Sequence, residues 1–161
     1  MKSFFLAIFL LLTARLCGAP RLAAQTASSA HQTPSGLFGD WKSTAGSIVR
    51  VDRCGAHICL SLVQLIHTNG ATTDIHNPNP ALQTRPLCGL RIGSGFTLVD
   101  PDHAIDGALY DPLNGKNYRG SITLRGGLLS LRGYVGIPLF GSSQTWTRPT
   151  EPVVPCAAGK Q

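Results

Sequence analysis

Short apolar segments rich in Ile, Val, Leu and Thr alternate with turn residues over most of the chain, and none of them shows a helical repeat with caps. This pattern predicts an all-β domain. Turn residues such as Gly126-Gly127 and the run Asp111-Pro-Leu-Asn-Gly-Lys116 divide it into hairpins. We expect eight antiparallel strands, at residues 38–44, 47–54, 58–67, 89–98, 106–111, 117–125, 128–135 and 142–148.

The third expected strand is apolar on both faces. Ile58, Leu60 and Leu62 share one face, while Cys59 and Val63 make the other nearly as apolar. Such a strand suits a barrel that is covered on one side or that lines an apolar pocket. An eight-stranded barrel has an interior that side chains fill or that holds one small ligand.

Several polar residues are candidates for ligand contacts. The run Asp74-Ile-His-Asn-Pro-Asn-Pro80 is a rigid loop that would place Asp74 and Asn77 together, either to bind the polar end of a ligand or to cap backbone groups. Four more candidates lie within expected strands, where they could orient a ligand inside the barrel or face solvent: Tyr110, Tyr118, Arg132 and Tyr134.

The N-terminal segment reads as a targeting signal. One positive charge, Lys2, precedes an apolar run too short to span a bilayer comfortably, which predicts a secretory signal peptide cleaved after Ala24. Cys17 is a poor lipidation site because Leu16, a large residue, precedes it. We therefore divide the chain into a signal peptide at 1–24, a leader at 25–37, a barrel domain at 38–149 and an extended tail at 150–161.

The net charge changes when the signal is removed. Lys2, Arg15 and Arg21 leave with it, which lowers the formal charge from +6 to +3. The remaining basic residues are scattered singly, without a polybasic run or a base-stacking aromatic motif, so nucleic-acid binding is not expected. We expect an exported monomer, periplasmic or secreted, with no transmembrane span in the mature chain.

Four cysteines remain after export, and an even number in an exported protein predicts disulfides. Cys54 and Cys59 flank an apparent hairpin turn with a four-residue loop and are expected to pair. Cys88 and Cys156 would then form the second bond. A metal site is not expected, because Cys-x4-Cys with distant His67 and His76 fits zinc ligation poorly.

Taken together, these features resemble a family of small exported bacterial proteins grouped as domain of unknown function 2147, which look like lipocalins or, more broadly, calycins. The resemblance runs from Gly39 to Arg148. Its landmarks are Gly39-Asp-Trp41, the Cys54 and Cys59 pair, Asp74 to Pro80, Tyr110-Asp-Pro112, Gly115-Lys-Asn-Tyr118, Arg132-Gly-Tyr-Val-Gly136, Gly141 and Trp146-Thr-Arg148.

The resemblance implies a calycin-like barrel in which Trp41 and Arg148 take structural positions, the arginine packing on the indole at the closed end. It implies no agreed activity. The polar loop expected at 99–106 lacks the tryptophan that the resemblance implies there, which suggests that the mouth of this barrel differs from that of its relatives.

Enzyme signatures are missing from the sequence: there is no Gly-x-Ser-x-Gly elbow, His-Glu-x-x-His motif, phosphate-binding loop or dinucleotide fingerprint. The one glutamate, Glu151, lies in the tail. A catalytic or metal-binding site could still be formed by a group of aspartates together with His103. A haem-binding site would need His67 or His76 to point inward. We favour a non-enzymatic protein without a cofactor. The aspartates of the possible catalytic or metal-binding site are Asp100, Asp102, Asp106 and Asp111.

The leading hypothesis is therefore a barrel that binds a small hydrophobic or amphipathic molecule, such as a fatty acid or envelope lipid, with an arginine or tyrosine near its mouth holding the polar end. The alternative is a module that recognises a protein or the cell wall through its outer surface, with a barrel filled by side chains. The volume of the interior distinguishes the two.

Overall fold

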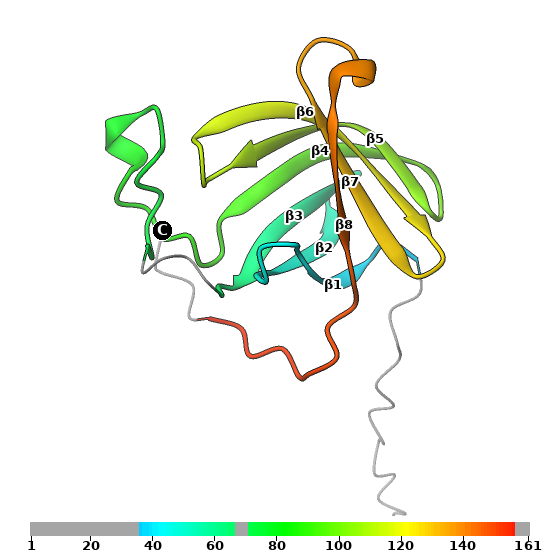
Figure 1. Cartoon of the computed structure of the whole chain (residues 1–161), viewed down its shortest axis with the longest axis horizontal. Helices are drawn as coiled ribbons and strands as arrows, with labels where there is room; N and C mark the ends of the chain where they lie inside the picture. The colour runs from blue at the N-terminus through cyan, green and yellow to red at the C-terminus, as the bar shows by residue number, and fades with distance from the viewer. Residues whose placement is uncertain (1–35, 67–70, 157–161) are drawn as a thin grey trace, which may run out of the picture. The chain divides into compact units, whose positions relative to one another are not determined.

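The computed structural model describes residues 36–66 and 71–156. The predicted signal peptide, most of the predicted leader and His67 lie outside the described residues. Within them, eight antiparallel strands form one sheet in the order β1 to β8, each paired with the next along the chain (Figure 1). The strands are β1 (Gly39–Lys42), β2 (Ile48–Cys54), β3 (His57–Gln64), β4 (Arg91–Asp100), β5 (His103–Asp111), β6 (Lys116–Arg125), β7 (Leu128–Tyr134) and β8 (Ser142–Trp146).

This arrangement confirms the predicted all-β, eight-stranded barrel. Two short 3-10 helices interrupt the connections: η1 (Pro80–Leu82) between β3 and β4, and η2 (Pro138–Phe140) between β7 and β8. Both begin with a proline, whose fixed φ suits the first helical position.

The polar segment 99–106 is mostly strand, contrary to the sequence interpretation. β4 continues to Asp100 and β5 begins at His103, so the turn consists of Pro101 and Asp102 alone. A register shift interrupts the pairing of β5 with β6, and Asp106 lies within it at a φ of 60°. The Pro101 carbonyl oxygen lies against Gly36, so this turn is at the closed end of the barrel and not at its mouth.

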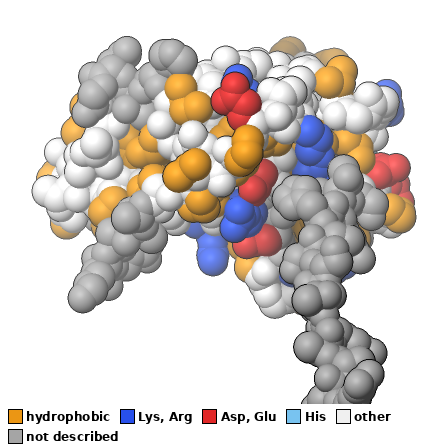
Figure 2. Space-filling model, turned by 90° about the horizontal axis from the view of Figure 1, so that it is seen from below, with side chains coloured by type: hydrophobic (Ala, Val, Ile, Leu, Met, Phe, Trp, Pro, Cys, Tyr) orange, Lys and Arg blue, Asp and Glu red, His pale blue; other side chains and the backbone are white. Residues whose placement is uncertain are grey.

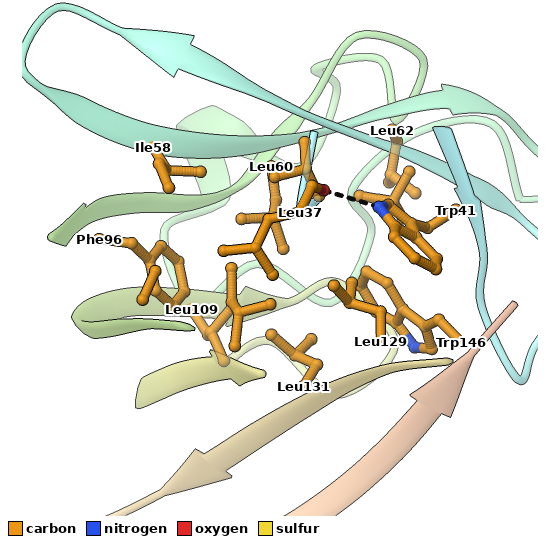
Figure 3. Packing of buried hydrophobic residues seen from close by; sticks show 14 of the residues in the cluster. Leu37, Trp41, Ile58, Leu60, Leu62, Phe96, Leu109, Leu129, Leu131 and Trp146 are labelled. Atoms are coloured by element: carbon orange, nitrogen blue, oxygen red, sulfur yellow. Dashed lines mark hydrogen bonds between the residues drawn. The ribbon is translucent and has the colours of Figure 1, made fainter. Parts of the chain in front are cut away.

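The first and last strands meet where the barrel closes. The backbone N–H of Lys42 donates to the Thr147 carbonyl at 2.8 Å, and the Thr147 N–H donates back at 3.1 Å. Next to this bridge, the Arg148 guanidinium lies 3.6 Å from the centre of the Trp41 ring and donates to the Gly36 carbonyl at 2.8 Å. The Trp41 indole N–H in turn donates to the carbonyl of Leu37 (Figure 3).

Large buried side chains fill the closed half of the barrel, where Leu37, Phe96 and Ile58 point toward one another (Figure 3). Two facing glycines make room for them. Gly107 pairs with Gly120, and a methyl group on either would overlap the Phe96 ring or the Leu109 side chain. The barrel is therefore tightly packed at these two glycines.

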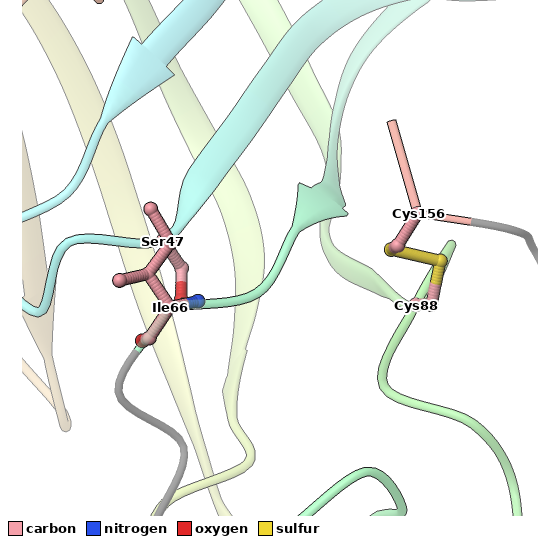
Figure 4. The surroundings of a disulfide bond; sticks show 4 residues. All are labelled: Ser47, Ile66, Cys88 and Cys156. Carbon is pink, nitrogen blue, oxygen red and sulfur yellow. A yellow bond between two sulfur atoms is a disulfide. The ribbon is translucent and has the colours of Figure 1, made fainter. Parts of the chain in front are cut away.

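Both predicted disulfides are present. Cys54 bonds to Cys59, with Cα atoms 5.8 Å apart. Cys88 bonds to Cys156, with Cα atoms 6.0 Å apart (Figure 4). The expected geometry of the first bond was wrong: Cys54 pairs with His57 across a two-residue turn, and Cys59 pairs with Asp52. The bond therefore joins diagonal neighbours on two strands and not residues directly opposite each other.

The second disulfide attaches the C-terminal tail to the barrel. Beside it, the backbone N–H of Cys156 donates to the Val63 carbonyl at 2.8 Å, so the chain at Cys156 lies against β3. The nearby Ser47 hydroxyl contacts both the N–H and the carbonyl of Ile66, which joins the β1–β2 connection to the end of β3 (Figure 4). These contacts fix the rim of the barrel on the side where its interior is open.

Candidate functional site

A cavity of about 370 Å³ occupies the half of the barrel opposite the Trp41–Arg148 pair. It opens where β1 is connected to β2, β5 to β6 and β7 to β8. Trp146, Leu131 and Leu62 are among the apolar side chains that line it, and Ser43, Asp111 and Gln144 are among the polar ones. The interior is thus neither fully filled nor fully open.

The electrostatic character of this lining is unusual for a site expected to hold an acid. Among the described residues that line the cavity there is no Lys, Arg or His, and Asp111 is the one carboxylate. The expected arginine at the mouth is not part of this lining. The lining instead offers hydroxyl and amide groups on mostly apolar walls.

Tyr110 connects the cavity wall to a buried polar network. Its hydroxyl donates to Oδ1 of Asp74 at 2.6 Å, and the Asn77 amide donates to the other carboxylate oxygen at 2.8 Å. The Arg85 guanidinium forms a salt bridge to the same oxygen at 2.7 Å and lies over the Tyr110 ring. Burial, followed by the hydrogen bond to Asp74, raises the pKa of Tyr110 above its ordinary value.

This network holds the long connection between β3 and β4 in place. Asp74 has no exposed surface, and its backbone N–H donates to the Arg85 carbonyl at 3.0 Å. The Asn77 side chain accepts from the N–H of Asn79, and Gly115 packs directly against the His76 carbonyl. The predicted loop therefore does bring Asp74 and Asn77 together. Their described contacts are with protein groups, and ligand contact by either stays a prediction.

Tyr118 lines the cavity beside the turn between β5 and β6. Its hydroxyl oxygen accepts a hydrogen bond from the Asn114 amide at 3.1 Å, and the same amide donates to Asp111. Among the hydrogen bonds of the described residues, none uses the Tyr118 hydroxyl as a donor. Tyr118 is thus placed to donate to a ligand.

Arg132 and Tyr134 are not part of the cavity lining. Leu131 and Gly133 line the cavity, and side chains alternate along β7, so these two residues face the other side of the strand. The Arg132 guanidinium donates to the Pro138 carbonyl at 2.6 Å and to the Ser143 hydroxyl at 3.1 Å. Arg132 therefore supports the β7–β8 connection.

The residues of β8 that line the cavity were missed from the sequence. Ser142, Gln144 and Trp146 are spaced by two, which places them on one face of the strand. The Gln144 amide oxygen accepts from the Trp146 indole at 3.1 Å and from the Thr44 hydroxyl at 3.2 Å. Alternation along this strand was the signal that could have found them.

Across residues 36–66 and 71–156, no three His, Cys, Asp or Glu side chains lie close enough to hold a metal ion. Over the same ranges, no helix is long and apolar enough to cross a membrane.

An eight-stranded antiparallel sheet whose ends meet, packed at one end and hollow at the other, defines a lipocalin-like β-barrel. The chain belongs to the bacterial family described as "Uncharacterized protein conserved in bacteria (DUF2147)", whose model matches residues 39–148. This match confirms the family suggested by the sequence landmarks.

Among solved structures, the chain is similar to protein HP1028 from Helicobacter pylori, described as belonging to the lipocalin family. The TM-score is 0.64 and the sequence identity 21%, and the similarity covers 71% of this chain and 84% of that one. At this identity the likeness shows the fold alone. No curated protein matches the chain.

Proposed function

We propose that the protein is an exported, non-enzymatic barrel that binds one small hydrophobic or amphipathic molecule in the cavity. The observation that carries this proposal is the volume of about 370 Å³ behind mostly apolar walls. Pockets for small ligands typically measure roughly 300–1,000 Å³ and combine apolar walls with a few polar groups. Each methylene buried there would contribute about 0.8 kcal/mol to binding.

The residues that line the cavity also determine which kind of polar group a ligand can carry. Tyr118 and Gln144 can donate hydrogen bonds, and Asp111 can accept them or attract a cation. A carboxylate ligand would find no basic partner among the described lining residues, and burying an unpaired charge is costly. We therefore favour an amphipathic envelope lipid or similar molecule with an uncharged or cationic end over the fatty acid that the sequence suggested.

Export is supported by two observations of different kinds. Two disulfides are typical of proteins that work in an oxidising compartment outside the cytoplasm. The first residues of the sequence follow the pattern of a secretory signal. We propose a periplasmic or secreted monomer.

The experiment compares three probes that share one saturated chain and differ only at the end: an alcohol, an ammonium and a carboxylate. Binding is followed by calorimetry on protein that has been stripped of lipid. We expect the alcohol and the ammonium to bind at one site, and the carboxylate to bind at least about tenfold more weakly because it is unpaired. Equal binding of all three would contradict the selectivity.

Cavity-filling variants locate the site. Gly133→Val adds volume where a Cβ would meet Tyr118 at an ordinary 3.7 Å, and Leu131→Trp fills more of the cavity. Both should abolish probe binding while retaining the near-ultraviolet circular dichroism of a folded barrel. The matched control is Leu128→Trp, a half-exposed position on the same strand. If no probe binds the original protein, the recognition-module alternative replaces this proposal.

A further inference from the structure

The connection between β7 and β8 exposes an unusual number of large apolar side chains. Val135 is 70% exposed, Ile137 53%, Leu139 77% and Phe140 79%. They lie close together in sequence, in the orange loop that projects beyond the ends of β7 and β8 (Figure 1). Single exposed apolar residues are common, but a group of this kind marks a contact with a partner or a membrane.

The loop is held in this conformation by polar contacts. Nη2 of Arg132 donates to the carbonyl oxygens of Pro138 and Leu139, and Nη1 donates to the Ser143 hydroxyl. Within the loop, the Gly141 N–H donates to Pro138 to close the 3-10 turn η2. The apolar side chains are therefore presented by a supported scaffold, so that little ordering is needed when they bind.

Charge is distributed unevenly between the two parts of the barrel. From residue 112 to residue 150, which covers β6, β7, β8 and their connections, the sequence contains no Asp or Glu. On the face seen in Figure 2, by contrast, acidic and basic side chains lie next to one another. The basic residues of the 112–150 segment are Lys116, Arg119, Arg125, Arg132 and Arg148.

The apolar loop and two of these basic residues are at the mouth of the cavity. The loop is bounded by Gly133 and Ser142, which both line the cavity. Arg119 is opposite Tyr134, the last residue of β7, and forms an exposed 3.4 Å ion pair with Asp106. Lys116 begins β6, farther toward that end of the barrel. An apolar tip, neighbouring cations and the opening of an apolar cavity are thus contiguous.

We propose that this loop docks the barrel, mouth first, on a lipid bilayer that carries anionic headgroups. The four apolar side chains enter the boundary between headgroups and acyl chains, while Lys116 and Arg119 stay at the level of the phosphates. Basic side chains are attracted to an anionic surface, and salt screens this attraction. An apolar ligand then passes between the bilayer and the cavity without crossing water.

The inference goes beyond the proposed function, since docking needs no bound ligand. The test uses the exported protein, whose N-terminus is determined by mass spectrometry. Its co-sedimentation is measured with vesicles made of equal parts phosphatidylglycerol and phosphatidylcholine. The double variant Leu139→Ser, Phe140→Ser should bind at least about tenfold more weakly. The control Val99→Ser removes an exposed apolar side chain from β4, near the closed end, and should bind like the original protein.

Binding should also fall on vesicles of phosphatidylcholine alone and at high salt. The double variant should still take up the alcohol probe from solution, which separates failed docking from a failed cavity. Equal vesicle binding by the double variant and the original protein would overturn the proposal, as would no binding by either. Self-association that the double variant abolishes, measured by sedimentation velocity without vesicles, would assign the loop to a second copy of the chain and overturn it too.

Discussion

The hydroxyl of Tyr110 donates a 2.6 Å hydrogen bond to Oδ1 of Asp74, a carboxylate without exposed surface. This bond joins the end of β5 to the connection between β3 and β4, two segments that are otherwise far apart in sequence. Arg85 supplies the compensating charge, and Asn77 completes the set of partners. The same few side chains therefore hold Tyr110 in place at the cavity wall and balance the buried charge of Asp74.

Replacing Tyr110 by Phe removes one partner from this buried carboxylate. We expect the free energy of unfolding to fall by about 1–3 kcal/mol, the cost of an unsatisfied buried acceptor. Urea unfolding followed by circular dichroism measures the change. Tyr118→Phe is the control, because the Tyr118 hydroxyl accepts only from the exposed Asn114 amide, and it should cost clearly less. Equal losses in the two variants would contradict this role for Asp74.

Alkaline pH should weaken the same network. The pKa of Tyr110 is raised in the folded protein by burial and by its bond to Asp74, whereas in the unfolded chain it returns to about 10. Between these values the unfolded state holds fewer protons, so stability is fully present below about pH 10 and is lost as the pH rises through the folded pKa. The difference in phenolate absorbance between the original protein and Tyr110→Phe isolates this titration. A midpoint at or below the ordinary value would contradict it.

Gly115 is needed for two separable reasons. Its φ of +70° is a left-handed conformation, and a Cβ there would overlap the His76 carbonyl. Gly126 also has a positive φ, +56°, but has open space around it. Gly126→Ala should therefore cost about 1–2 kcal/mol from backbone strain alone, and Gly115→Ala should cost more. Thermal unfolding of the two variants measures the excess, and equal shifts would argue against the contact with His76.

The two disulfides should differ in their contributions. Cys54 and Cys59 are separated by 5 residues, whereas Cys88 and Cys156 are separated by 68. Chain-entropy estimates give about 2 kcal/mol for the short loop and about 4 kcal/mol for the long one. Replacing each pair with serines and measuring the free energy of unfolding should reproduce this order. A larger loss from the Cys54–Cys59 pair would show that entropy of the unfolded chain does not dominate.

Local sequence patterns predicted the strands well, and one local irregularity caused the main error, which was the loop expected at residues 99–106. Alternation and turn residues placed all eight strands because each is paired with its neighbour in sequence. The polar positions around Asp102 resembled a long loop, because Asp106 lies in a register shift that breaks the alternation of β5. The pattern of hydrophobic and polar residues does not reveal that a residue inside a strand has a positive φ.

The candidate site was harder to predict from the sequence, because it depends on which face of each strand points inward. Arg132 and Leu131 are adjacent in sequence, yet only Leu131 lines the cavity. One residue of register decides between them. The partnership of Arg85 with Asp74 depends on how a connection without strands folds back on itself, which hydrophobic spacing does not encode.

The bridge between Lys42 and Thr147 also bears on the order in which the barrel assembles. Among the described strands, every ladder joins two strands that are consecutive in sequence, so each strand can pair with the one before it as the sheet grows. Among the backbone pairings of the described residues, this bridge alone joins the first strand to the end of the last one, where the entropy of loop closure is greatest. We therefore expect this seam to be the last pairing to form during folding and the first to exchange its amide hydrogens in the native protein.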